Sequence, residues 1–130
     1  MKKDLEIPEV KNVTVAVIRE SDGTWKVYLL NNNDFDLENT LVSSTGYGEK
    51  EGEKQKTSTL RHFLETVSAR SSALIEPIDE KVFHLNNEYW VSYYIGRQIY
   101  DKKFVFVPET ICEENLIYIK ELEKEGILHS

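Results

Sequence analysis

The chain has 130 residues, of which 40% are hydrophobic and 30% are charged. This length and composition are typical of one folded domain with a hydrophobic core, and they exclude an intrinsically disordered chain. The formal net charge of −7 argues against nucleic acid as a partner, because nonspecific binding to nucleic acid needs a basic surface that displaces counterions.

Cysteine usage and the absence of long apolar runs bear on the location of the protein. Cys112 is the only cysteine, so no disulfide can form within the chain, which fits a reducing compartment. The first ten residues, MKKDLEIPEV, lack the apolar stretch of a secretion signal, and no stretch approaches the roughly 20 apolar residues that cross a bilayer. We therefore expect a cytoplasmic protein that does not associate with membranes.

Segments rich in β-branched and aromatic residues follow one another along the chain and are separated by turn residues. The segments predicted to be strands are residues 12–19, 25–30, 37–45, 56–67, 73–78, 88–95 and 99–107. Ser21-Asp22-Gly23 predicts a hairpin turn between the first two strands. Single helical turns are expected within residues 79–85 and 111–115.

The segment from Trp25 to Gly48 organises this pattern, because it reads as a strand, a polar corner at residues 31–36 and a second strand. Gly46-Tyr47-Gly48 is predicted to end that second strand. The charged run at residues 49–54, which contains no apolar side chain, is then expected to be a mobile, solvated loop.

About seven strands at spacings of roughly 10 residues, without a long amphipathic helix, predict an all-β fold. We expect a single immunoglobulin-like or fibronectin-like β-sandwich with its core at about residues 11–108 and a docked C-terminal tail at residues 109–130. The apolar spacing of that tail fits either a helix or extended chain, and we expect it to be extended or irregular. Tyr89 has two interpretations: a tyrosine corner, whose hydroxyl bonds back to the preceding loop, or an ordinary core aromatic.

No residue pattern predicts catalysis, a metal or a cofactor. The soft metal ligands, which are His62, His84, Cys112 and His129, do not have the spacing of any known zinc motif. Cys112 lies beside two glutamates, which disfavour a reactive thiolate, and no serine lies in a G-x-S-x-G elbow. We therefore predict that the protein is not an enzyme and holds no cofactor or metal.

Two features are candidates for a partner contact. In strand geometry Thr57, Thr59 and Arg61 would share one face, where their donors could hold an anionic or amide-bearing partner; the alternative is the solvated face of an edge strand. In the aromatic strand at residues 88–95, Trp90 and Tyr94 would lie on the outer face while their neighbours fill the core. That outer face would be covered by the C-terminal tail, by a second copy of the chain in a homodimer, or by a protein partner.

Parts of the sequence resemble known families. The segment VYLLNNNDFDLENTLVSSTGYG, at residues 27–48, looks like accessory sandwich domains of the immunoglobulin-like type, a structural resemblance that implies no chemistry. The whole chain resembles a family of short uncharacterised bacterial proteins, through residues 7–13 (IPEVKNV), 56–62 (KTSTLRH), 85–91 (LNNEYWV) and 124–128 (KEGIL). Some members of that family are labelled phenylalanyl-tRNA synthetase subunit alpha, although a chain of this length cannot contain a class II synthetase core.

Three functions are compatible with these observations. The first is a small non-catalytic binding or scaffolding module that contacts its partner through the aromatic outer face. The second is recognition of a ligand such as a carbohydrate, stacked on an exposed Trp25 or Trp90 ring. The third is a synthetase-associated subunit, which predicts a basic patch around Lys54, Lys56 and Arg61, together with Arg70.

Overall fold

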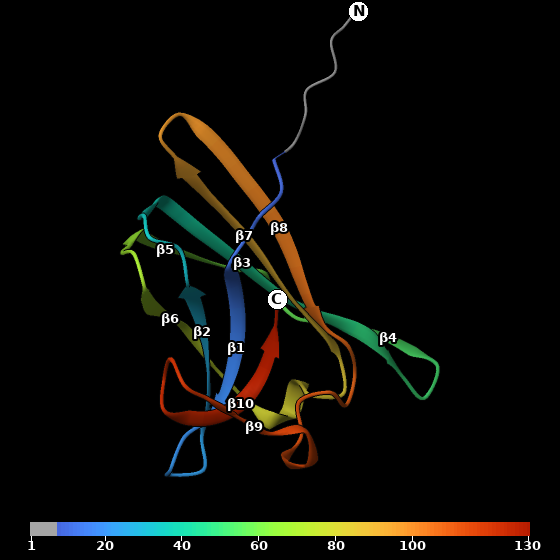
Figure 1. Cartoon of the computed structure of the whole chain (residues 1–130). Helices are drawn as coiled ribbons and strands as arrows, with labels where there is room; N and C mark the ends of the chain where they lie inside the picture. The colour runs from blue at the N-terminus through green and yellow to red at the C-terminus, as the bar shows by residue number, and fades with distance from the viewer. Residues whose placement is uncertain (1–7) are drawn as a thin grey trace, which may run out of the picture.

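Strands with alternating inward and outward side chains form two antiparallel sheets that pack face to face in the computed structural model, which describes residues 8–130 (Figure 1). The β1 sheet contains, in spatial order, β6 (Ser71–Ile78), β2 (Trp25–Asn31), β1 (Val13–Arg19), β10 (Lys124–His129) and β9 (Ile117–Ile119). The β7 sheet contains β4 (Glu53–Lys56), β3 (Leu37–Lys50), β7 (Asn86–Ile95) and β8 (Gln98–Phe106), with β5 (Leu60–Val67) also paired to β3. The prediction of an all-β sandwich is confirmed.

Short 3-10 turns, η1 (Glu80–Val82) and η2 (Glu113–Asn115), interrupt the strands where single helical turns were expected. Within residues 8–130 no helix has the length and apolar character needed to cross a membrane. The N-terminal stretch considered above for a secretion signal lies, up to residue 7, outside the described residues.

The core fills the space between the two sheets. Val15, Val17 and Leu29 of the β1 sheet are completely buried and belong to one apolar cluster with Tyr89 and Tyr93 of the β7 sheet. Burying side chains of this size stabilises a fold by about 1.5–3 kcal/mol each. The hydroxyl of Tyr89 donates a hydrogen bond to Glu76 on β6 at 3.1 Å, so Tyr89 is a core aromatic that bridges the sheets and is not a tyrosine corner.

The polar corner after β2 is built around the buried amide of Asn31. Its Nδ2 donates to the backbone carbonyls of Phe35, Val67 and Ser68, at 2.9, 3.2 and 3.0 Å, and its Oδ1 accepts from the backbone N–H of Asn33 at 3.0 Å. Because buried backbone groups must find partners, this one amide joins the corner to the end of β5. The predicted role of the corner, in which short polar side chains satisfy local backbone groups, is confirmed.

The prediction that Gly46 and Gly48 end a strand is wrong. β3 continues through both residues to Lys50, and a two-residue turn at Glu51-Gly52 returns the chain into β4, so the charged run is a hairpin arm and not a loop (Figure 1). A Cβ atom at Gly46 would lie 3.3 Å from Leu85, and one at Gly48 would lie equally close to it. Glycine at these positions therefore allows close packing, by Leu85 at both and also by Thr57 at Gly46, and does not mark a turn.

The C-terminal segment, residues 109–130, is extended or irregular over most of its length, as expected, but it is not a tail docked on the sandwich, because it forms part of a sheet. β10 pairs with β1 over Val15 to Arg19 and lies inside the β1 sheet, between β1 and β9. The described residues thus form ten strands, where the sequence predicted about seven. The pattern of this segment fitted both helix and extended chain, and the choice depends on β1, more than 100 positions earlier in the chain.

The segment before β10 folds back over the outer face of the β1 sheet. Ile119 is buried there with Ala16, Ile18 and Leu30 in a second apolar cluster, to which Leu122 also packs. The C-terminal segment therefore covers an outer sheet face, but the face belongs to the β1 sheet and not to the sheet that carries Trp90.

Candidate functional site

The outer face of the β7 sheet carries the aromatic residues that were singled out in the sequence. Trp90 lies in the middle of this face, paired with Ser43 on β3 and with Lys103 on β8. Its side chain is 42% exposed, and that of Tyr94, four residues further along the same strand, is 36% exposed. The predicted outward orientation of both residues is confirmed.

A groove crosses this face and has a volume of about 540 Å³. Its lining comes from β3, β4, β5, β7 and the stretch between β4 and β5, and consists of Ser43, Thr45, Tyr47, Lys56, Thr59, Arg61, Glu88 and Trp90. Thr59 shares a 2.8 Å hydrogen bond with Thr45, and Arg61 pairs with Ser43, the residue that also pairs with Trp90. The structure thus brings Thr59, Arg61 and Trp90, which the sequence placed in two separate features, onto one surface.

Large apolar side chains lie on either side of Trp90 on the same face. The exposed fraction is 61% for Phe63 on β5, 36% for Leu41 on β3 and 47% for Ile99 on β8. Strand register places Phe63 beside Leu41, and Ile99 beside Tyr94. We call the surface formed by Leu41, Phe63, Trp90, Tyr94 and Ile99 the aromatic face. The sequence did not single out Phe63, Leu41 and Ile99, because only the strand pairing in the structure shows that they share a face with Trp90.

The ring of Trp90 is held in place by its neighbours on β8. The Lys103 ammonium lies 4.4 Å from the ring centroid, and the indole N–H of Trp90 donates a hydrogen bond to Asp101. A cation over an aromatic ring contributes about 0.5–1 kcal/mol at an exposed site. The indole is therefore oriented on the surface without being buried.

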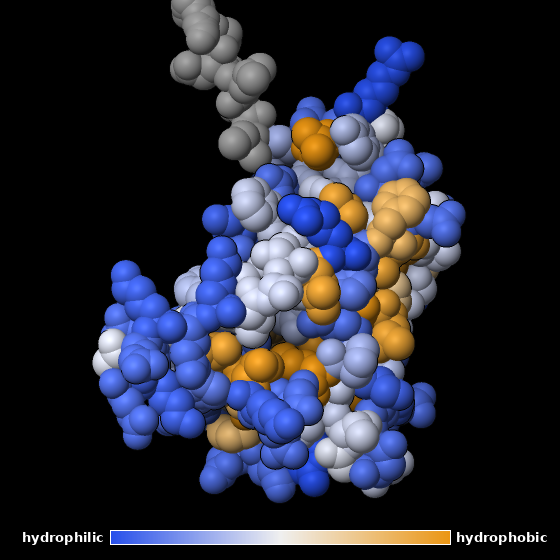
Figure 2. Space-filling view, turned by 180° about the vertical axis from the view of Figure 1, so that it is seen from behind, coloured by the Kyte–Doolittle hydropathy of each residue, from blue (hydrophilic) through white to orange (hydrophobic). Residues whose placement is uncertain are grey.

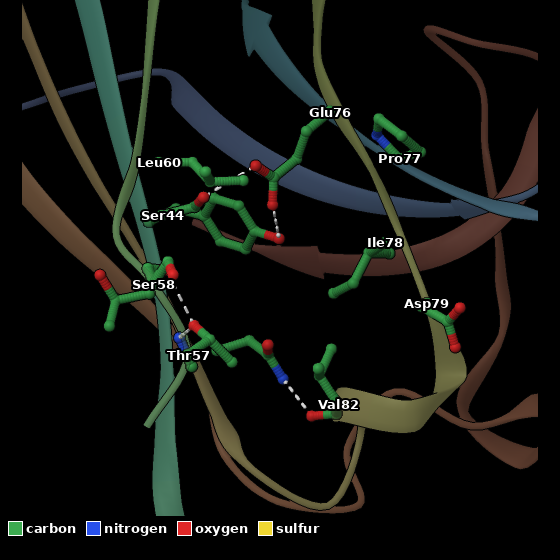
Figure 3. Close-up of a pocket in the computed structure, with 13 residues that line it drawn as sticks. Ser44, Thr57, Ser58, Leu60, Glu76, Pro77, Ile78, Asp79 and Val82 are labelled. Carbon is green, nitrogen blue, oxygen red and sulfur yellow. Dashed lines mark hydrogen bonds between the residues drawn. The ribbon is translucent and has the colours of Figure 1, made fainter. Parts of the chain in front are cut away.

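Thr57 does not lie with Thr59 and Arg61, so the prediction of a shared face for the three is wrong. Thr57, Ser58 and Thr59 separate β4 from β5, and this irregular stretch breaks the alternation on which the prediction depended. The hydroxyl of Thr57 accepts a 2.8 Å hydrogen bond from the backbone N–H of Gly46, and its side chain lines a recess at the edge between the two sheets (Figure 3).

This recess has a volume of about 250 Å³ and a mixed lining, with the Glu76 carboxylate pointing into it from β6 (Figure 3). In Figure 2, which views the molecule from behind, an apolar hollow lies beside the hydrophilic arm formed by β3 and β4. Glu76 accepts hydrogen bonds from Ser44 at 2.7 Å and Tyr89 at 3.1 Å, and its Oε1 lies 2.7 Å from Nε2 of His62. The carboxylate is thus already fully engaged within the protein.

Ser44, Glu76 and His62 do not form a catalytic triad. In a triad the histidine lies between the serine and the carboxylate, where it takes the proton of the nucleophile. Here the serine donates directly to the carboxylate, and the histidine bonds to that same carboxylate. Burial, together with the Glu76 carboxylate, raises the pKa of Tyr89 far above its ordinary value, so this phenol stays protonated and does not act as a base.

The basic residues of the sequence do not form one patch. Arg70 lies in the turn between β5 and β6, where its Nε is 2.7 Å from the Asp34 carboxylate. Lys54 and Lys56 lie on β4, at the other end of the β4–β5 stretch, and Glu49 pairs with Lys54 across the hairpin. Of the cations expected to gather, only Arg61 and Lys56 line the same groove.

Within residues 8–130, no three side chains of the histidine, cysteine or acidic type are arranged to hold a metal ion. Comparisons with models of protein families, with curated proteins and with solved structures find no match for this chain.

Proposed function

We propose that the protein is a non-catalytic binding module that contacts a protein partner through the aromatic face. The observation that carries this proposal is the difference between the two outer faces of the sandwich. Ile119 and Leu122 cover the apolar residues of the β1 sheet, whereas Trp90 and Phe63 on the β7 sheet remain 42% and 61% exposed. Exposed apolar clusters of this kind, with an aromatic centre and a polar rim, are typical of protein contacts.

The surroundings of Trp90 favour a protein over a carbohydrate as the ligand. A sugar stacks on the open face of an aromatic ring, and here Lys103 lies over the Trp90 ring. Trp25, the other tryptophan, is only 4% exposed and packs edge-on against Phe83. The charges around Trp90 are mixed, with Arg61 and Lys103 near Glu88 and Asp101, and such a rim suits a protein surface.

The distribution of basic residues gives no support to a synthetase-associated or RNA-binding subunit. RNA binding of that kind needs several cations on one continuous surface. Arg70 is paired with Asp34, and Lys54 lies on an arm that also carries Glu49, Glu51 and Glu53.

The proposal includes an immunoglobulin-like or fibronectin-like form of the sandwich. In one sheet β1, β2 and β6 lie side by side in that order, as strands A, B and E do in that fold. In the other sheet β3, β7 and β8 follow the order of strands C, F and G, and both orders support this assignment. β10 and β9 would then be additional strands that extend the first of these sheets beyond β1, the equivalent of strand A. We also propose a cytoplasmic location, based on the single cysteine.

The test is a comparison of proteins captured by tagged chains from an extract of the cells that produce the protein. A Trp90→Ala variant should lose a protein that the wild-type chain retains, because the centre of a contact surface contributes most of its binding energy. The matched control is Tyr118→Ala, which removes a more exposed aromatic, 65% against 42% for Trp90, outside the aromatic face. The partner, once purified, should bind the Trp90→Ala variant at least tenfold more weakly.

A partner retained equally by the wild-type chain, the Trp90→Ala variant and the control would contradict the assignment of the surface. A glycan panel offers a second measurement. In a Trp25→Phe background, all tryptophan fluorescence comes from Trp90. A saturable change in that fluorescence on addition of a sugar would favour the carbohydrate alternative.

A further inference from the structure

β8 is an edge strand of the β7 sheet. It pairs with β7 along its whole length, and among the described residues no strand pairs with its other edge. Nine residues of backbone, Gln98 to Phe106, therefore have half of their hydrogen-bonding groups pointing away from the sheet. A long edge of this kind is a template for another strand.

The turn between β7 and β8 determines which backbone groups point outward. Ile95 pairs with Gln98 across a two-residue turn that begins with Gly96 at a φ of +61°, as in a type II′ hairpin. The residues flanking such a turn bond to each other, and bonded pairs alternate along the ladder. The N–H and C=O groups of residues 99, 101, 103 and 105 consequently face the open edge.

The sequence of β8 is complementary to itself when read in the opposite direction. With Lys102 at the centre, Ile99 falls opposite Val105 and Asp101 falls opposite Lys103. Tyr100 falls opposite Phe104 on the other face of the strand. Each of these is a favourable cross-strand pair, either apolar, oppositely charged or aromatic.

We propose that two copies of the chain associate by antiparallel pairing of their β8 strands around Lys102. The four outward-facing residues of each strand then bond to those of the second copy, 99 with 105 and 101 with 103. A two-fold axis perpendicular to the sheet generates this arrangement, which is the usual symmetry of a dimer. The two β7 sheets become one continuous sheet, and their aromatic faces lie on the same side.

Alternative registers are less favourable. A shift by two residues in one direction places Asp101 opposite Asp101. A shift by two in the other direction places Lys103 opposite Lys103. Like charges directly opposite each other are destabilising. A shift by one residue would place side chains of the outer face opposite side chains of the core face. The register around Lys102 also has one like-charged pair, Lys102 with Lys102, but among the registers that keep the faces matched it alone adds two pairs of opposite charge, Asp101 with Lys103 on each side of the axis.

Lys102 is the one residue that opposes its own copy. In the single chain its ammonium lies 4.9 Å from the ring centroid of Phe104, so the side chain leans along its own strand. The central pair is not hydrogen-bonded, and side chains opposed at such a pair lie close together, so the two Lys102 charges oppose dimerisation. The repulsion is opposed by two Asp101–Lys103 pairs, one on each side of the axis.

The first measurement is the solution mass of the purified full-length chain as a function of concentration, by sedimentation equilibrium. A contact made by one edge strand is small, so we expect a reversible dimer with a dissociation constant on the order of 100 μM. A chain that stays monomeric at concentrations tenfold above that value would overturn the proposal.

Charge reversal tests the register. Asp101→Lys alone, or Lys103→Asp alone, places like charges opposite each other at both 101–103 pairs of the dimer. Each variant should therefore dimerise at least about tenfold more weakly. A mixture of the two variants restores opposite charges in both pairs, so it should form a heterodimer with an affinity close to that of the wild type. Two variants that dimerise as well alone as together would overturn the register.

Hydrogen exchange provides a readout that needs no variant. As the total chain concentration rises to about ten times the dissociation constant, about one chain in five stays monomeric, so the amides of residues 99, 101, 103 and 105 should exchange about fivefold more slowly. The amides of residues 100, 102 and 104, which already face β7, should not change. Protection of the outward amides that is independent of concentration would mean that the edge is covered within one chain, and it would also overturn the proposal.

This inference does not rest on the proposed function, and the two can fail separately. A Trp90→Ala variant should keep the dimer while losing the protein partner. The charge-reversal variants should lose the dimer. Since both charged residues contact Trp90, their unfolding midpoints in urea are measured beside the wild type to verify that the fold is intact.

Discussion

The two outer faces of the sandwich carry similar apolar residues but differ in what covers them. On the β1 sheet, Ala16, Ile18 and Leu30 are almost completely buried, because the chain around Ile119 folds back over them. On the β7 sheet, the aromatic face around Trp90 has no such cover among the described residues. The comparison shows that an apolar outer face can be part of the folded core or an open surface, and only the path of the rest of the chain distinguishes the two.

The covered face should account for a large part of the stability, and Ile119 is the residue that tests this most directly. Ile119→Ala removes a side chain that is only 1% exposed and leaves a cavity over Ala16 and Ile18. We expect the free energy of unfolding to fall by about 3 kcal/mol, measured by urea denaturation. A loss below about 1 kcal/mol would mean that the segment covers the face only loosely.

The close approach of that segment depends on Gly126. A Cβ atom at this position would lie 2.5 Å from the carbonyl oxygen of Val17 and 2.9 Å from Cδ1 of Ile119. Gly126→Ala should therefore push the covering segment away from the sheet and lower the free energy of unfolding by about 2 kcal/mol. The control is Glu125→Ala, an exposed position on the same strand, where a change within about 0.5 kcal/mol is expected in the same denaturation experiment.

Glu20 connects the covered face to β10 and gives its stability a pH dependence. Its carboxylate accepts hydrogen bonds from Lys124 at 2.7 Å and from Tyr28 at 3.0 Å. The hydrogen bond from Lys124 is the main cause of a lowered pKa of Glu20, and burial opposes it in part. Because the pKa is lower in the folded protein than in the unfolded chain, the stabilisation is present above the unfolded pKa of about 4.3 and is lost as the pH falls through the folded pKa.

The corresponding variant is Glu20→Gln, compared with the wild type by urea denaturation between pH 7 and pH 2. At pH 7 the variant should be less stable by about 1 kcal/mol, since it keeps a weaker, uncharged partner for Lys124 and Tyr28. The difference should shrink below the unfolded pKa and vanish once Glu20 of the folded wild type is protonated. A difference that stays constant over this range would mean that the charge of Glu20 does not contribute.

Local patterns predicted most strands and turns correctly, and the errors share a physical cause. The turn at Ser21 to Gly23, where Gly23 donates to the carbonyl of Glu20 at 3.0 Å, depends on neighbouring residues alone. The pairing of β10 with β1 and the packing of Leu85 against Gly46 depend on residues far apart in the sequence. Glycine was interpreted as a turn signal where it instead allows a close contact.

The candidate site was predicted in part for the same reason. Strand alternation placed Trp90 and Tyr94 on an outer face, because both lie in the regular strand β7. The same rule failed for Thr57, since the irregular stretch between β4 and β5 turns its hydroxyl towards Gly46. Thr59 and Arg61 lie beside Trp90 because β5 pairs with β3, and no local pattern in the sequence predicts that pairing.

The smallest expected effect on stability is that of Trp90→Ala, and it completes the comparison. The side chain is 42% exposed, and its main contacts are Lys103 over the ring and the hydrogen bond to Asp101. Removing it should lower the free energy of unfolding by about 0.5 kcal/mol, the contribution of an exposed cation–aromatic contact, in the urea experiment used for Ile119→Ala. A loss as large as that of Ile119→Ala would make Trp90 part of the structural core and would remove the argument for an open contact surface. A small loss, together with the loss of a bound partner, would mean that this tryptophan serves binding and not folding.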